Sequence, residues 1–159
     1  GELSRIMLAF KKALKADANT CVLVFDEIDT GISGQTADVV GRKIAELSVS
    51  NQVICVSHLP QVAVYADTHF AARKSPNKDR TLSSVEVLDD SGRAHEIARL
   101  LSGKDVSRAS LMNAKALFDE ASKKAPAKVF AKSKQKEHSA GVANAPGVTF
   151  VSHRGKRLG

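Results

Sequence analysis

Two adjacent carboxylates, Asp26 and Glu27, directly follow a run of apolar residues, and a third acid, Asp29, comes two residues later. Paired acids of this kind suit a nucleotide-hydrolysing site, because one carboxylate can hold a hydrated Mg²⁺ while its neighbour orients or deprotonates the attacking water. An ordinary strand that meets a polar turn gives the same pattern. The choice between the two therefore depends on the elements that position the acids.

The apolar run and a second one further along the chain are predicted to be neighbouring strands of one sheet. The predicted elements are, in order, a strand over 21–26, a helix over 35–48 and a strand over 52–57. This order predicts a βαβ unit with parallel strands and a right-handed crossover. Because parallel strands end at the same edge, Asp26, Glu27 and His58 are expected to lie together, where open α/β sheets bind ligands.

The rest of the sequence predicts an α/β domain followed by a different kind of segment. Periodicity predicts helices over 2–16, 93–102 and 106–121 and strands over 68–74 and 82–88, with a polar loop from Ser75 to Arg80. From Ser122 onward the chain is rich in Lys, Ala, Ser, Gly and Pro, which predicts disorder, although Val148 to Val151 could form a short strand. We therefore expect one domain over 1–121 and a basic low-complexity tail over 122–159.

Composition excludes several classes of protein. The formal net charge of +7 comes from residues 123–159, which hold nine basic residues and one acid, so the predicted domain itself is nearly neutral. The scarcity of aromatic residues argues against a base-stacking module. The chain has no long apolar run and no recognisable signal peptide. Cys21 and Cys55 lie in apolar strands and are predicted to be reduced core thiols, which fits a cytoplasmic location.

Four segments occur in a fixed order: GELSRIMLA at 1–9, VFDEIDTGISG at 24–34, VSHLPQVA at 56–63 and HEIARLLSG at 95–103. Together they resemble the second half of an ATP-binding-cassette ATPase head. More specifically, they resemble the C-terminal part of the RecN family of bacterial DNA-repair proteins, which are related to SMC proteins. The resemblance implies the C-terminal lobe of a P-loop NTPase-like head, with a partly parallel sheet flanked by helices.

The resemblance implies a role for each residue of the predicted sheet edge. Asp26 matches the Walker B acid, which holds Mg²⁺ through water. Glu27 matches the general base that polarises the hydrolytic water. His58 matches the switch histidine, which contacts the γ-phosphate of ATP. A strand-end histidine bonded to the backbone is the structural alternative for His58.

Other positions match the parts of a cassette that meet a second subunit. Gly1 and Glu2 match the end of the signature motif, where glycine amides and a helix N-terminus hold the γ-phosphate of ATP bound to the opposite head. Asp29 begins the D-loop, which crosses the dimer interface in this family. The resemblance therefore implies ATP and Mg²⁺ as cofactors, and a second head and DNA as partners.

The family pattern is incomplete in this chain. No GxxxxGK[ST] phosphate loop occurs, and the glutamine that supplies a further metal contact has no clear candidate. The resemblance implies that both belong to an N-terminal half of the same head, which is therefore a further expected partner. The chain alone is not expected to hydrolyse ATP.

Three functional hypotheses remain open from the sequence. The leading one is a fragment of an SMC-like ATPase at the nucleoid, acting in double-strand-break repair and recombination. The second is a DExD-type helicase fragment, although that family places Ser-Ala-Thr where this chain has Ser57-His58-Leu59. The third is a DNA-binding module that acts through the basic tail, without catalysis. Four cations over residues 73–80 could contact DNA, although a solvated loop explains them better, namely Arg73, Lys74, Lys78 and Arg80.

Overall fold

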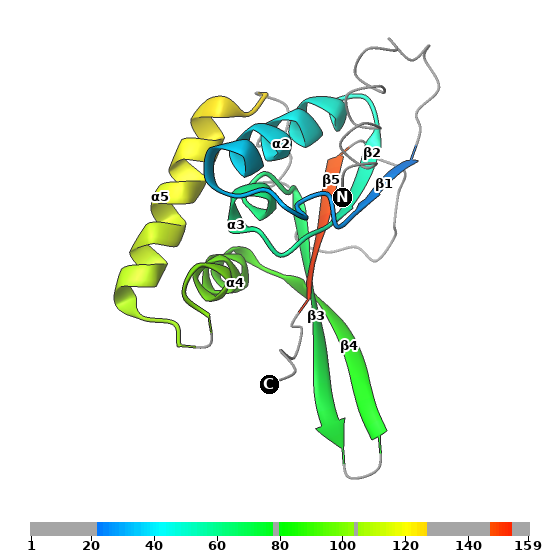
Figure 1. Ribbon diagram of the computed structural model, residues 1–159, viewed down its shortest axis with the longest axis vertical. Coiled ribbons are helices and arrows are strands. Elements are labelled where there is room, and N and C mark those ends of the chain that lie inside the picture. Colours follow the sequence, from blue (N-terminus) through cyan, green and yellow to red (C-terminus); the bar gives the residue numbers. More distant parts are fainter. Residues whose placement is uncertain (1–21, 78–79, 104, 127–146, 154–159) are drawn as a thin grey trace.

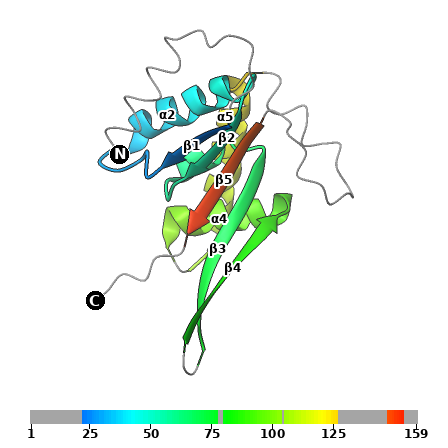
Figure 2. The same cartoon turned by 90° about the vertical axis from the view of Figure 1, so that its right-hand side faces the viewer.

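The computed structural model describes residues 22–77, 80–103, 105–126 and 147–153. Its centre is a five-stranded sheet with the strand order β1-β2-β5-β3-β4. The helices of the described chain lie on one face of this sheet, as the two perpendicular views in Figure 1 and Figure 2 show. Within these ranges, no helix has the length and apolarity needed to cross a lipid bilayer.

The predicted βαβ unit forms the part of the sheet that carries the acids. It consists of β1 (Val22–Asp26), α2 (Gly34–Leu47) and β2 (Gln52–Val56). The two strands are parallel and in register from the Val22–Gln52 pair to the Asp26–Val56 pair, as predicted. Ser33 is the N-cap residue of α2, but its side chain makes no capping hydrogen bond.

A short helix leads from this unit into an antiparallel hairpin. Helix α3 (Pro60–Ala63) begins with a proline, which suits a first helical turn. Strands β3 (Thr68–Asn77) and β4 (Arg80–Leu88) follow and pair as far as Asn77 and Arg80. The predicted loop over 75–80 was therefore too long, because backbone hydrogen bonds continue the ladder through polar residues that lack an apolar period.

Two helices then pack together. Helix α4 (Asp90–Ser102) begins before the predicted residue 93, because the Asp89 carboxylate caps it by accepting a hydrogen bond from the Gly92 N–H at 2.7 Å. Gly103, at φ 86°, ends this helix as predicted. Helix α5 (Arg108–Lys124) continues past the predicted domain boundary, since Lys124 forms an ion pair with Asp38 of α2 at 3.1 Å.

The last described strand comes from the segment predicted to be a tail. Strand β5 (Gly147–His153) is parallel to β2 on one side and to β3 on the other. Phe150 is fully buried and contacts the ring of His69 edge to face, with 4.9 Å between ring centroids. The expected short strand over 148–151 is thus present and lies inside the sheet, whereas residues 127–146 and 154–159 lie outside the described chain.

The core lies between the sheet and its helices. Its largest fully buried side chains include Tyr65, Phe150, Ile28, Ile44 and Ile97. Cys55 is a free, buried thiol within β2, as predicted. The predicted helix over 2–16 and Cys21 lie outside the described residues.

Candidate functional site

The acidic pair stands at the carboxyl end of β1. Leu23 and Phe25 of this strand are buried, so the alternation of a strand leaves Asp26 exposed on the opposite face. Glu27 is also exposed, and its backbone N–H donates to the carbonyl of Val56 at 3.2 Å. The end of β1 is therefore tied to the end of β2.

Glu27 adopts a backbone conformation that is unusual for its residue type. Its φ is 49°, which makes it the one non-glycine residue with positive φ in the part of the chain that the structure describes. A turn holds this conformation, because the Thr30 N–H donates to the Glu27 carbonyl at 3.1 Å and Ile28 is fully buried. Strained residues of this kind concentrate at functional sites, where the surrounding structure enforces them.

Asp29 points into the molecule from the same loop. Its side chain is 1% exposed. One carboxylate oxygen, Oδ2, accepts hydrogen bonds from the Ser57 hydroxyl and from the His58 backbone N–H, the latter at 2.8 Å. The other oxygen, Oδ1, has no hydrogen-bond partner among the described residues. The structure thus shows Asp29 in contact with the end of β2, and its role in nucleotide binding stays a prediction.

His58 lies at the same edge, immediately beyond β2. Its ring nitrogen Nδ1 lies 2.9 Å from Asp29 Oδ2, while the side chain as a whole is 60% exposed. The ring is therefore held from one side and open to solvent on the other. The ring thus contacts a side-chain carboxylate, and its role as a switch histidine stays a prediction.

Ser57 belongs to the same network, although the sequence alone did not single it out. Its hydroxyl donates to Asp29 and accepts from the Leu59 N–H at 3.1 Å, and its own N–H donates to the carbonyl of Val151 in β5 at 3.2 Å. The sequence does carry a signal for it: Ser57 is a polar residue that directly follows an apolar strand and precedes His58.

The thiol of Cys55, in the strand that ends at this edge, is unreactive. Burial, together with the negative charges of Asp29 and Asp26, raises the pKa of Cys55 to about 12. The thiol therefore stays neutral and serves as core. Its environment also shows that both carboxylates act electrostatically on the same point of β2.

The described residues do not form a complete metal site. Within them, no group of three or more His, Cys, Asp and Glu side chains is arranged to hold a metal ion. Asp26 is exposed and therefore suits the water-mediated contact to Mg²⁺ that the resemblance implied, with direct ligands from elsewhere. Gly1 and Glu2, the predicted signature residues, lie outside the described chain.

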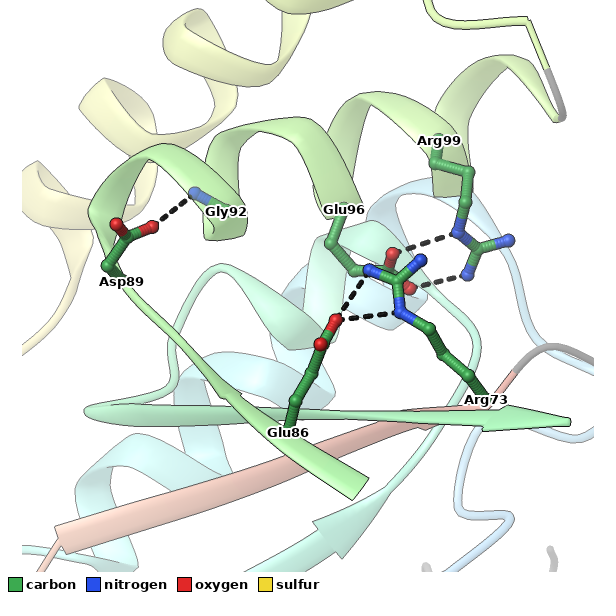
Figure 3. Close-up of polar contacts among 6 residues, drawn as sticks. All are labelled: Arg73, Glu86, Asp89, Gly92, Glu96 and Arg99. Atoms are coloured by element: carbon green, nitrogen blue, oxygen red, sulfur yellow. Dashed lines mark hydrogen bonds and ion pairs between the residues drawn. The ribbon is translucent and has the colours of Figure 1, made fainter. Parts of the chain in front are cut away.

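Ion pairs form within the hairpin and within α4. Figure 3 shows Arg73 of β3 directed at Glu86 of β4, with Arg73 Nε 2.7 Å from Glu86 Oε1. In α4, which the segment HEIARLLSG helps to form, Arg99 Nε lies 2.9 Å from Glu96 Oε2. Arg73 is thus paired with an acid of the neighbouring strand, and the expectation about DNA contact stays a prediction.

Comparison with known proteins gave the following matches. No family model matches the chain. The chain is 42% identical over 119 residues, or 75% of its length, to the DNA repair protein RecN of Halalkalibacterium halodurans. It is 40% identical over 121 residues to RecN of Bacillus subtilis and 46% identical over 118 residues to RecN of Rickettsia conorii. The chain spans only 21% to 22% of the length of these relatives.

Proposed function

Since this chain is a relative of RecN DNA-repair proteins over about three quarters of its length, we propose that it is the C-terminal lobe of an SMC-like ATPase head. The proposed head binds and hydrolyses ATP and acts in DNA double-strand-break repair and recombination. One observation carries the proposal: Asp26, Glu27 and His58 converge at one edge of two parallel strands. This edge is where α/β sheets bind ligands.

Each of the three residues has a proposed task at this edge. Glu27, whose side chain is exposed, is the general base that orients and deprotonates the attacking water. Asp26 holds a water of hydrated Mg²⁺, and the ion neutralises charge on the phosphates when it is bound. His58 contacts the γ-phosphate through the exposed side of its ring. The phosphate cradle itself is supplied by another part of the protein.

The open face of the sheet supports this division of the head. No helix of the described chain covers that face (Figure 2), although sheets with parallel strands are normally covered on both sides. Its outer strands expose valines at 55% to 65%, namely Val22, Val24, Val85 and Val87. Asp26 lies on this same face, two residues after Val24. We propose that the N-terminal half of the head packs here and thereby brings its phosphate loop to Asp26.

Two further partners follow from the same proposal. A second head would complete the site through its signature motif, to which Gly1 and Glu2 correspond. ATP would hold the two heads together and hydrolysis would release them, which would change how the protein engages DNA.

The substitution Glu27→Gln tests the proposal in a protein that also contains the N-terminal half of the head. Glutamine keeps the shape of the side chain but cannot accept the proton of the attacking water. We expect ATP turnover to fall by about 10²- to 10⁴-fold, the usual contribution of a general base. ATP-dependent dimers of the head should persist, because binding does not require the base. Turnover and dimerisation would be measured by phosphate release and by light scattering.

Glu120→Gln is the matched control, because Glu120 is exposed on α5 and its ion pair with Lys124 is long, at 3.7 Å. This variant should hydrolyse ATP like the unmodified protein. Unchanged turnover in Glu27→Gln would remove Glu27 from the role of base. No specific observation favours the helicase or the tail-only hypothesis.

A further inference from the structure

The loop that follows β2 stabilises the buried carboxylate of Asp29. An ionised side chain loses its hydration when it is buried, and only hydrogen bonds or an opposite charge offset that cost. For Asp29 this offset comes from the Ser57 hydroxyl and the His58 backbone N–H, which both donate to Oδ2, and His58 Nδ1 lies 2.9 Å from the same oxygen. The loop after β1 is thus joined to the loop after β2 by a single carboxylate.

The direction of each hydrogen bond in this network follows from its neighbours. The Ser57 oxygen already accepts the Leu59 N–H, so the serine hydroxyl hydrogen goes to Asp29. An ionised carboxylate accepts only and would repel a ring lone pair 2.9 Å away, so we expect His58 Nδ1 to carry a hydrogen. In the neutral ring the hydrogen then sits on Nδ1, and Nε2 keeps its lone pair.

We propose that Asp29, supported by Ser57, is the positioning residue for His58. It holds the ring in the Nδ1–H tautomer with Nε2 on the open side, and it balances the positive charge when Nε2 is also protonated and donates to a phosphate. This inference rests on the proposed function for its consequence in hydrolysis. Because Asp29 is also two residues from Glu27 in one tight turn, the same carboxylate sets the position of the base relative to the histidine.

The tautomer of His58 tests the positioning directly in the 159-residue chain, without ATP. Two-bond ¹H–¹⁵N correlation spectra at alkaline pH, where imidazoles are neutral, distinguish the nitrogen that carries the hydrogen. We expect the Nδ1–H form for His58 in the unmodified chain. Asp29→Ala should lose this preference, whereas Asp29→Asn should retain it, because the amide oxygen still accepts from the ring and from Ser57.

The spectra contain their own controls. His95 is exposed on α4, far along the chain from this network, and its tautomer should be the same in all variants. Glu120→Gln removes an exposed acid of α5, whose ion pair is with Lys124 of the same helix, and it should leave the His58 signal in the Nδ1–H form. The positioning role is excluded if His58 of the unmodified chain carries its hydrogen on Nε2, or if it shows the same mixture of tautomers as His95.

The consequence for hydrolysis has a separate readout. With the upstream half restored, we expect Asp29→Ala to lower kcat by on the order of 10- to 100-fold through misplacement of the ring, with a smaller change in KM. Asp29→Asn should restore most of the rate. If Asp29→Ala changes the tautomer of His58 as expected but leaves kcat unchanged, the positioning of His58 has no consequence for hydrolysis. The role of the base is tested independently by Glu27→Gln.

Discussion

Histidine 69 shows how burial changes the chemistry of a single residue away from the candidate site. Its side chain, which belongs to β3, is fully buried and meets the ring of Phe150 in β5 edge to face. Burial lowers its pKa from the ordinary 6.5 to about 4, and the positive charge of Arg93 acts in the same direction. Glu96 acts against the shift and Arg99 adds to it. The imidazole is therefore neutral in the folded protein near pH 7.

This shift predicts that acid destabilises the fold in a defined pH range. Between about pH 6.5 and 4 the unfolded chain binds a proton at His69 that the folded chain does not bind. The free energy of unfolding should therefore decrease as the pH falls through this range, by at most about 1.4 kcal/mol per pH unit. Above pH 6.5 His69 should have no effect, and below pH 4 its effect should be constant. Urea denaturation from pH 4 to 7.5 measures the slope.

The comparison with His69→Leu isolates this residue, because other groups titrate in both proteins and cancel in the difference. The variant should show a smaller loss of stability between pH 6.5 and 4. His95→Gln, which changes an exposed histidine of α4, should follow the unmodified chain. Parallel pH curves for His69→Leu and the unmodified chain would contradict the prediction.

At the scale of the elements, a glycine allows two helices to approach closely. A Cβ atom on Gly41 of α2 would lie 2.6 Å from Tyr65 Cδ2 and 2.9 Å from the backbone oxygen of Gln61. The Tyr65 hydroxyl also donates to Asp38 of α2 at 2.8 Å, and burial together with this bond raises the tyrosine pKa. The position of α2 over the sheet thus depends on a residue without a side chain.

We therefore expect Gly41→Ala to destabilise the fold. Alanine favours a helix over glycine by about 1 kcal/mol, but the contact with the Gln61 backbone cannot be relieved by a rotamer change. Overpacking of this kind costs about 1–3 kcal/mol, so the free energy of unfolding should decrease or, at the lower limit, stay constant. Thr36→Ala, at an exposed position of the same helix, reports the effect of helix propensity alone. An increase in stability for Gly41→Ala would show that α2 moves away at little cost.

For the whole molecule, β5 is the strand that connects the two parts of the sheet. It lies between the parallel pair β1–β2, which carries the candidate site, and the hairpin β3–β4. Its Phe150 is fully buried, and its Val151 carbonyl accepts the Ser57 N–H next to the candidate site. A strand from the segment that composition predicts to be a tail therefore supports the position of the acidic edge.

Removing this strand should destabilise the described fold. Phe150→Ala is expected to cost about 3–5 kcal/mol in chemical denaturation, as for other buried aromatic side chains. Thr149→Ala, a neighbouring substitution at a half-buried position of the same strand, should cost much less. A chain that ends after residue 126 tests the division into a domain and a separate tail. If that shorter chain unfolds at the same denaturant concentration as the full one, the division is correct and β5 contributes nothing to stability.

The sequence by itself determined the βαβ unit, the acidic pair at its edge and the relation to RecN, because periodicity, element order and motif spacing are properties of neighbouring residues. Only the tertiary structure decided that Asp29 turns inward to His58, since its partners lie 28 and 29 residues further along the chain. The same holds for β5, a short strand in a segment whose composition favours disorder, because its place in the sheet follows from the burial of Phe150 against His69. Such contacts depend on which surfaces meet when the chain folds, and no local pattern records them.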